Sequence, residues 1–304
     1  MQDYKAILGD IHRDLSSKTN KGQVATYIPE LAHIDKNKFG IHLKTIDGFE
    51  FGIGDCYTSF SIQSISKVLA LSKAIALIGE TVWQRVGVEP SGHPFNQLAL
   101  LEVEKGIPRN PFINSGAIVI ADILLSYLKN PKDDFLRYIR DLANDDSIGF
   151  NEDVALSEKI TGFKNYAAAN LLKSFNNLEN AVEDVLDFYF YQCSIEMTCS
   201  QLNHTFFFLA NKGNCLLNKS RLTKTQAKRI NALMLSCGFY DEAGEFAFEV
   251  GLPGKSGVGG GIVALLPNHF VITTWAPGLN PKGNSLLGMQ SLEQFTTKTK
   301  LSIF

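Results

Sequence analysis

The chain contains no run of about 18 apolar residues, the length that a helix needs to cross a bilayer, so we expect no membrane segment. Neither sign of charge is in excess, because Lys and Arg total 29 and Asp and Glu total 31. A nucleic-acid-binding protein would be expected to have a basic surplus, so nucleic acid is not an expected partner. The composition, 45% hydrophobic and 20% charged, is that of a globular protein whose ligand is expected to be small.

Cysteine is scarce and shows no pairing pattern. The five cysteines are odd in number and include no CxxC, which favours reduced thiols over a disulfide framework. The six histidines are scattered without the close spacing of a metal site, so we expect no metal and no organic cofactor. The first residues also lack the apolar stretch of a secretory signal. These absences together predict a cytoplasmic protein.

Strand-like segments lie near both ends of the chain, and the middle, roughly residues 80–236, is mostly helical in pattern. Asp47-Gly48 and Pro267-Asn268 each separate two strand-like segments and predict hairpins. Thr223 and Gln226 have capping-box spacing, and beyond Gly238 the pattern favours strands. The predicted helices include residues 3–16, 64–78 and 285–297, and the predicted strands include residues 39–44, 49–51, 261–266 and 269–275.

This layout predicts an α/β fold of the α+β kind. One antiparallel sheet is built from both termini and flanked by helices, and an all-helical subdomain is inserted between its halves. We interpret the chain as a single domain, with a sheet-containing part at about 1–80 and 238–304 and a helical part at about 81–237. The active site is expected in the cleft between the two parts.

The first chemical signal is the sequence Ser64-Ile65-Ser66-Lys67. Residues i and i+3 lie on one face of a helix, so Lys67 can lie beside Ser64. A serine hydroxyl is a weak nucleophile without a base, and a buried lysine can act as that base because burial disfavours the ammonium form. The same spacing recurs at residues 126–129 and also arises from a capping serine followed by a solvated lysine. The motif alone therefore does not identify a site.

The second signal is Lys255-Ser256-Gly257 followed by Val258 and three more glycines, just before a predicted strand. Glycines let a substrate approach the backbone, and a main-chain N–H there can form half of an oxyanion hole. Alone, this segment equally suits a turn before a strand. An SxxK helix together with a Lys-Ser/Thr-Gly strand is the pairing of serine β-lactamases and penicillin-binding proteins. The two motifs together favour an acyl-serine hydrolase.

Longer segments resemble the serine-dependent glutaminases, which have a β-lactamase-like fold. The matching segments are residues 24–32, 60–68, 109–117, 189–194, 237–241 and 250–261, together with Ser157-Glu158 and Asn165. The resemblance implies a glutaminase catalytic domain that hydrolyses L-glutamine to L-glutamate and ammonia through a seryl acyl-enzyme, with no cofactor. It also implies a homo-oligomer, either a dimer or a tetramer.

The resemblance also implies roles for individual residues. Ser64 matches the nucleophile, Lys67 its proton-transfer partner, and Tyr240 a shuttle for the proton that goes to the leaving ammonia. The N–H groups of Ser64 and Val258 match the oxyanion hole, and Ser64, Tyr240 and Val258 are also expected to contact substrate. The other substrate-binding positions are Tyr27, Asn114, Glu158, Asn165 and Tyr189.

These residue types suit free glutamine on chemical grounds as well. A buried Glu158 could pair with the α-ammonium, while amide and hydroxyl donors could hold the α-carboxylate. Lys164 stands before Asn165 where the family commonly has Arg, and the two cations differ in geometry.

Two other interpretations remain open from the residues alone. A β-lactamase- or peptidase-like hydrolase would share Ser64, Lys67 and Lys255, but the Ser-x-Asn of such enzymes is matched only at residues 174–176. Nitrocefin turnover would favour that interpretation. A non-catalytic glutamine or glutamate sensor would be expected to have lost Ser64, Lys67 or Tyr240, and all three are present. Thermal stabilisation by glutamine without turnover would favour the sensor.

Overall fold

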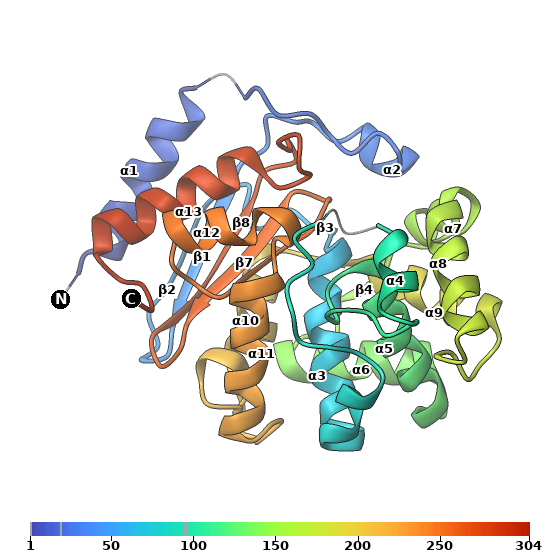
Figure 1. Ribbon diagram of the computed structural model, residues 1–304. Coiled ribbons are helices and arrows are strands. Elements are labelled where there is room, and N and C mark those ends of the chain that lie inside the picture. The colour runs from blue at the N-terminus through green and yellow to red at the C-terminus, as the bar shows by residue number, and fades with distance from the viewer. Residues whose placement is uncertain (1, 19, 94–96) are drawn as a thin grey trace.

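The computed structural model describes residues 2–18, 20–93 and 97–304 and contains a five-stranded antiparallel sheet with strand order β2-β1-β8-β7-β6 (Figure 1). The strands are β1 Gly40–Thr45, β2 Glu50–Gly54, β6 Gly254–Ser256, β7 Gly261–Leu266 and β8 Phe270–Trp275. Two of these strands come from the N-terminal part of the chain and three from the C-terminal part. They meet where β1 pairs with β8. The prediction of one sheet built from both ends of the chain is confirmed.

Both predicted hairpins are present. Between β1 and β2, Gly48 has a φ of 100°, a left-handed backbone that glycine adopts without strain. Between β7 and β8, Asn268 has a φ of 66°, which asparagine tolerates better than most residues. The His269 N–H donates to Leu266 O at 3.0 Å and closes this second turn.

Each face of the sheet is covered by helices, because side chains alternate along the strands. On β7, Ile262 and Ala264 belong to a core shared with α1 and α13, whereas Val263 and Leu265 belong to the larger core on the other face. The covering helices are α1 Tyr4–Ser16 and α13 Leu286–Thr299 on the first face, and α10 Cys199–Ala210 on the second (Figure 1). The helices predicted at residues 3–16 and 285–297 are therefore confirmed.

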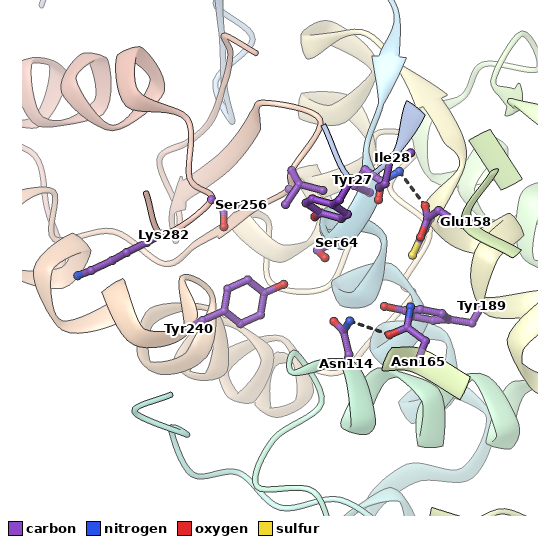
Figure 2. Close-up of a pocket in the computed structure, with 15 residues that line it drawn as sticks. Tyr27, Ile28, Ser64, Asn114, Glu158, Asn165, Tyr189, Tyr240, Ser256 and Lys282 are labelled. Carbon is purple, nitrogen blue, oxygen red and sulfur yellow. Dashed lines mark hydrogen bonds between the residues drawn. The ribbon is translucent and has the colours of Figure 1, made fainter. Parts of the chain in front are cut away.

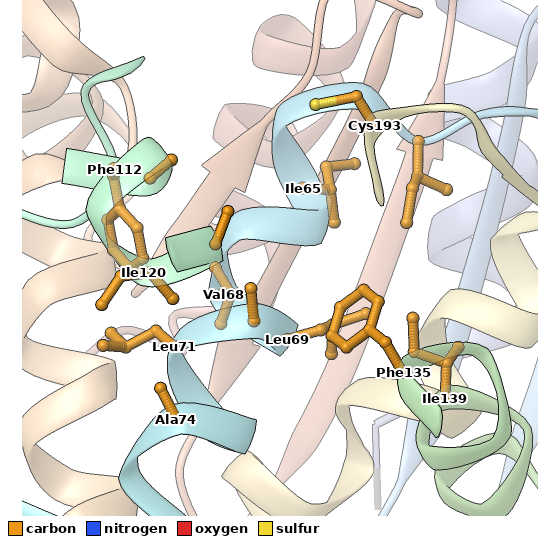
Figure 3. Packing of buried hydrophobic residues seen from close by; sticks show 14 of the residues in the cluster. Ile65, Val68, Leu69, Leu71, Ala74, Phe112, Ile120, Phe135, Ile139 and Cys193 are labelled. Carbon is orange, nitrogen blue, oxygen red and sulfur yellow. The ribbon is translucent and has the colours of Figure 1, made fainter. Parts of the chain in front are cut away.

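The helix that follows the SxxK serine, α3 Ser66–Ile78, lies at the centre of the helical half of the molecule. Its side chains Val68, Leu69 and Leu71 pack between Phe112 and Ile120 on one side and Phe135 on the other (Figure 3). The surrounding helices are α4 Ala99–Val103, α5 Asn114–Tyr127, α6 Pro131–Ala143, α7 Glu152–Thr161, α8 Phe163–Ser174, α9 Val182–Cys193 and α11 Lys224–Cys237. The buried contacts on both sides of α3 hold the helix in one position.

Local features define two helix ends. Gly79 follows α3 with a φ of 61°, a backbone that glycine adopts without strain. Thr223 and Gln226 form the predicted capping box at the start of α11, each side chain bonding to the other's backbone N–H.

Two features differ from the sequence prediction. The segment beyond Gly238 does not change directly to strands, because a 3-10 turn, Tyr240–Glu242, and helix α12, Ala243–Glu249, come first. The α12 segment contains two alanines and two glutamates, which favour helix, so the strand pattern begins only after it. A second sheet, of order β3-β5-β4, was not predicted. Its strands, β3 Phe60–Ser61, β5 Ile195–Met197 and β4 Gly149–Phe150, are too short to show a sequence period.

The five cysteines are all free and all buried. None of the helices in the described part of the chain combines the length and the apolar character that crossing a bilayer requires.

Candidate active site

Ser64 lies in a short 3-10 turn, Gln63–Ile65, that leads directly into α3. The preceding residue, Gln63, has a φ of 50°, a left-handed conformation that costs a non-glycine residue about 1–3 kcal/mol. Such strain is typical of functional turns, because the surrounding packing must hold it. The turn places Ser64 in a pocket of about 510 Å³, between Tyr240 and Tyr27 (Figure 2).

The glycine-rich segment after β6 packs directly against this turn. A Cβ on Gly257 would lie 2.5 Å from Ile62 O, and one on Gly259 would lie 2.1 Å from Ser61 O. Only glycine permits these approaches, so the glycines are required by the contact between the two segments. The result is that Val258 and Ser64 line the same pocket.

Tyr240 lies between the serine and two lysines. Its hydroxyl is 3.3 Å from Lys67 Nζ and 3.2 Å from Lys255 Nζ, and it points toward Ser64 in the pocket that both residues line (Figure 2). Its backbone is left-handed, with a φ of 58°, so the position is strained as well. Burial raises the pKa of Tyr240 above its ordinary value and keeps the phenol protonated.

Both lysines are fully buried beside this phenol. Lys67 Nζ also contacts Phe112 O at 3.1 Å and Asn114 Oδ1 at 2.6 Å, and burial lowers the pKa of Lys67 to about 8. Burial, with the nearby Lys67, holds the pKa of Lys255 well below its usual range. Because burial lowers the pKa of both lysines, their amines can be neutral near physiological pH.

Glu158 of α7 is the carboxylate among the described residues that line the pocket. It is buried and accepts a hydrogen bond from Gln63 Nε2 at 2.9 Å (Figure 2). Burial raises the pKa of Glu158 to about 7, although Gln63 and Lys67 oppose the shift. Burial destabilises the ionised form of this carboxylate. A bound ammonium would stabilise that form, because its charge offsets the cost of desolvation.

Neutral polar groups surround Glu158 at the same end of the pocket. Asn114 begins α5 and donates through Nδ2 to Asn165 Oδ1 of α8 at 2.9 Å, and Tyr189 of α9 lies beside them (Figure 2). This bond leaves the Asn165 amide N–H groups available to a ligand. Tyr27, which precedes α2 Pro29–Ala32, stands at the mouth with 55% of its surface exposed.

The structure brings together all of the residues singled out from the sequence. Lys67 lies behind the pocket wall, against Asn114 and Tyr240, and the others line the pocket itself. The lining residues are Tyr27, Ser64, Asn114, Glu158, Asn165, Tyr189, Tyr240 and Val258. The Tyr240 hydroxyl is hydrogen-bonded to Lys67 and lines the pocket together with Ser64, an arrangement that the helical spacing of the motif did not indicate.

Sequence reasoning missed Gln63 and Cys193, which also line the pocket. Both residues lie inside segments that carried the family resemblance, so their closeness in sequence to a candidate residue could have indicated them. Burial raises the pKa of Cys193, so this cysteine stays a thiol and is not a nucleophile. Within the described residues, no group of three or more His, Cys, Asp or Glu side chains is arranged to hold a metal ion.

Comparison with known proteins gives a consistent result. A model of the glutaminase family matches residues 22–304. The glutaminase of Christiangramia forsetii is 54% identical over 303 residues, covering 99% of this chain and all of the relative. The glutaminase of Saccharophagus degradans is 55% identical over 303 residues, with 99% of each chain covered.

Solved structures agree along the full length. The chain superposes on a probable glutaminase, ybaS, with a TM-score of 0.94 at 32% identity, covering 100% of this chain and 99% of the other. On a probable glutaminase of Bacillus subtilis the TM-score is 0.90 at 34% identity, with 98% and 96% covered.

Proposed function

Because the chain belongs to the glutaminase family and hydrolyses L-glutamine to L-glutamate and ammonia, we propose that it does so through an acyl-enzyme on Ser64. Family membership favours this activity over the β-lactamase-like and sensor interpretations. The mechanism is supported by three features of the pocket: a proton route, an oxyanion site and a polar end that suits an amino acid.

The observation that carries the proposal is the position of the Tyr240 hydroxyl, which points toward Ser64 in the shared pocket and is 3.3 Å from Lys67 Nζ (Figure 2). A neutral lysine has two N–H bonds and one lone pair. If the two N–H bonds go to Phe112 O and Asn114 Oδ1, the lone pair faces Tyr240. Lys67 is then the base, and Tyr240, whose pKa is raised by burial, relays the proton rather than accepting it.

The oxyanion site is formed by the backbone N–H groups of Ser64 and Val258. The close packing of Gly257 on Ile62 holds Val258 beside the nucleophile. Fixed dipoles of this kind stabilise the charge that develops in the transition state, and losing one donor costs about 10²–10³ in rate.

The substrate is held by its two charged ends. Glu158 pairs with the α-ammonium, Asn114, Asn165 and Tyr189 contact the α-carboxylate, and Tyr27 covers the mouth. This orientation directs the side-chain amide toward Ser64, because Glu158 and Ser64 lie at different places along the same pocket (Figure 2).

The reaction then proceeds in two balanced halves. Ser64 Oγ bonds to the side-chain carbonyl carbon while its proton passes through Tyr240 to Lys67. The C–N bond breaks, and the same proton returns through Tyr240 to the departing nitrogen, which leaves as ammonia. Water next attacks the γ-glutamyl ester and gives a proton to Lys67. The C–O bond to Ser64 breaks, the proton returns to Ser64 Oγ, and glutamate is released.

Replacement of the nucleophile tests this mechanism. Ser64→Ala is expected to abolish ammonia release from glutamine and to leave the circular dichroism spectrum and melting temperature close to those of the parent. Ser126→Ala, in the second SxxK sequence, is the matched control, because Ser126 Oγ bonds to the backbone of its own helix. Mass spectrometry of acid-quenched parent enzyme should show a γ-glutamyl adduct on Ser64. Full activity in Ser64→Ala would refute the assignment.

The structure also supports proposals on assembly and location. The described chain acts as one catalytic domain, in the cytoplasm, where its five free cysteines stay reduced. It forms a homo-oligomer, as the family resemblance implies. Phe248 and Phe304, 87% and 85% exposed, are large apolar groups left on the surface of the single chain. Light scattering across a concentration series measures the subunit number, and a monomer at all concentrations would contradict the proposal.

A further inference from the structure

A second, larger hollow of about 1060 Å³ adjoins the glutamine pocket. The two share Glu158 and Asn165, and the hollow continues over Thr161, Gly162, Phe163 and Lys164. These four residues form the end of α7, the joint and the start of α8. We call this hollow the vestibule.

The orientation of bound glutamine places its α-carbon at the boundary of the vestibule. Its side-chain amide must reach Ser64, and its ammonium must reach Glu158, which belongs to both spaces. A group attached beyond the α-carbon is then directed away from Ser64 and toward the vestibule. The reacting end of the substrate is unaffected by what occupies that space.

The two charged ends of glutamine are recognised with different strictness. The ammonium meets a buried carboxylate, Glu158, which requires a positive charge. The carboxylate meets the neutral donors of Asn165 and Tyr189. Among the described residues that line this pocket the lysine is Lys282, whose Nζ is 3.4 Å from Glu245 Oε2 and points away from Glu158 (Figure 2). Neutral donors bind a peptide carbonyl oxygen as well as a carboxylate oxygen.

From this asymmetry we propose that the enzyme also deamidates glutamine at the N-terminus of dipeptides, with the second residue in the vestibule. The inference rests on the proposed function of the Ser64 pocket. Phe163, 77% exposed, offers an apolar surface to the second side chain, and the exposed Lys164 offers a cation to the terminal carboxylate. Water and the side-chain amide give a carboxyl group and ammonia, and the peptide bond stays intact.

The test compares three compounds with the full-length enzyme at pH 7.5, where a peptide α-amine is still largely protonated. Glutamine, glutaminyl-phenylalanine and N-acetylglutamine are incubated separately, and the intact deamidated products are measured by mass spectrometry. Glutamine and the dipeptide are expected to react, whereas N-acetylglutamine, which lacks the ammonium, is not. Ser64→Ala should abolish both reactions, which excludes a contaminating activity.

The vestibule itself is tested by Phe163→Ala, with Phe248→Ala as the matched control on another exposed surface. Phe163→Ala should lower the ratio of kcat/KM for the dipeptide to that for glutamine by about tenfold, the order of discrimination that a lost apolar contact gives. Phe248→Ala should leave the ratio unchanged. If glutamine reacts and the dipeptide does not, or if Phe163→Ala leaves the ratio unchanged, the inference fails and the proposed function stands. If neither compound reacts, the proposed function itself fails.

Discussion

Activity should depend steeply on pH, because the proposed mechanism needs two buried groups, Glu158 and Lys67, in their deprotonated forms. Glu158 must be ionised to bind the α-ammonium, and burial raises the pKa of Glu158 to about 7. Lys67 must be neutral to accept a proton, and burial lowers the pKa of Lys67 to about 8. Both required forms are lost as pH falls, so the two effects act in the same direction.

The magnitude follows from these two values. At pH 6 about a tenth of Glu158 is ionised and about 1% of Lys67 is neutral, so the competent fraction is about one in a thousand. At pH 8.5 most of the enzyme is competent. The value of kcat/KM, which reports ionisations of the free enzyme, should therefore fall about thousandfold between pH 8.5 and pH 6, with a logarithmic slope that approaches two.

The assay is direct measurement of glutamate by chromatography, which avoids a coupling enzyme with its own pH dependence. Glu158→Gln separates the two groups. Its kcat/KM should be lower throughout, because the α-ammonium is unpaired, and its logarithmic slope should fall to one. The remaining transition should also move below pH 8, since the Glu158 carboxylate favours the ammonium form of Lys67. A flat profile between pH 6 and 8.5, or an unchanged slope in the variant, would refute the reasoning.

Three further substitutions test the relay, the oxyanion wall and the fold. Tyr240→Phe should lower kcat by about 10²–10⁴ with little change in KM, because it removes the relay hydroxyl but keeps the buried ring. Gly257→Ala should lower kcat by about 10²–10³, since its Cβ would displace the adjacent oxyanion donor. Gly244→Ala, with open space around the new Cβ, should keep the activity of the parent. Equal activity of the two variants would contradict the role of Gly257. Asp122→Ala should lower the free energy of unfolding in urea by about 3–5 kcal/mol, because it removes the fully buried partner of Arg85 and the acceptor of the Glu179 and Asn180 N–H groups. Removal of Glu179, the exposed partner of Arg85, should cost under about 1 kcal/mol.

Much of the local structure was predictable because its causes are local. Asp47-Gly48 marked a hairpin, and the Thr223 capping box began a helix, since each depends on residues only a few positions apart. The segment from Tyr240 to Glu249 was wrongly predicted, because a 3-10 turn and a seven-residue helix have too few turns to establish a period. The short strands of the second sheet escaped notice for the same reason.

The candidate residues were found from motifs, but their arrangement was not. Ser64 and Lys67 are close in sequence, so their proximity was predictable from helical spacing. The hydroxyl that joins them belongs to Tyr240, 173 positions from Lys67, and Gln63 reaches Glu158 across 95 positions. Contacts over such separations depend on how α3, α7 and the glycine-rich segment pack, which no local pattern contains.

The sequence by itself determined most of the helices and strands, the candidate nucleophile Ser64 with Lys67 three residues later, and the family. Only the tertiary structure decided that Lys67 and Lys255 are both buried against one phenol, and that Glu158 is buried in the wall of the same pocket. The physical reason is that the protonation state of a side chain is set by its surroundings, and distant segments create those surroundings only when the chain folds.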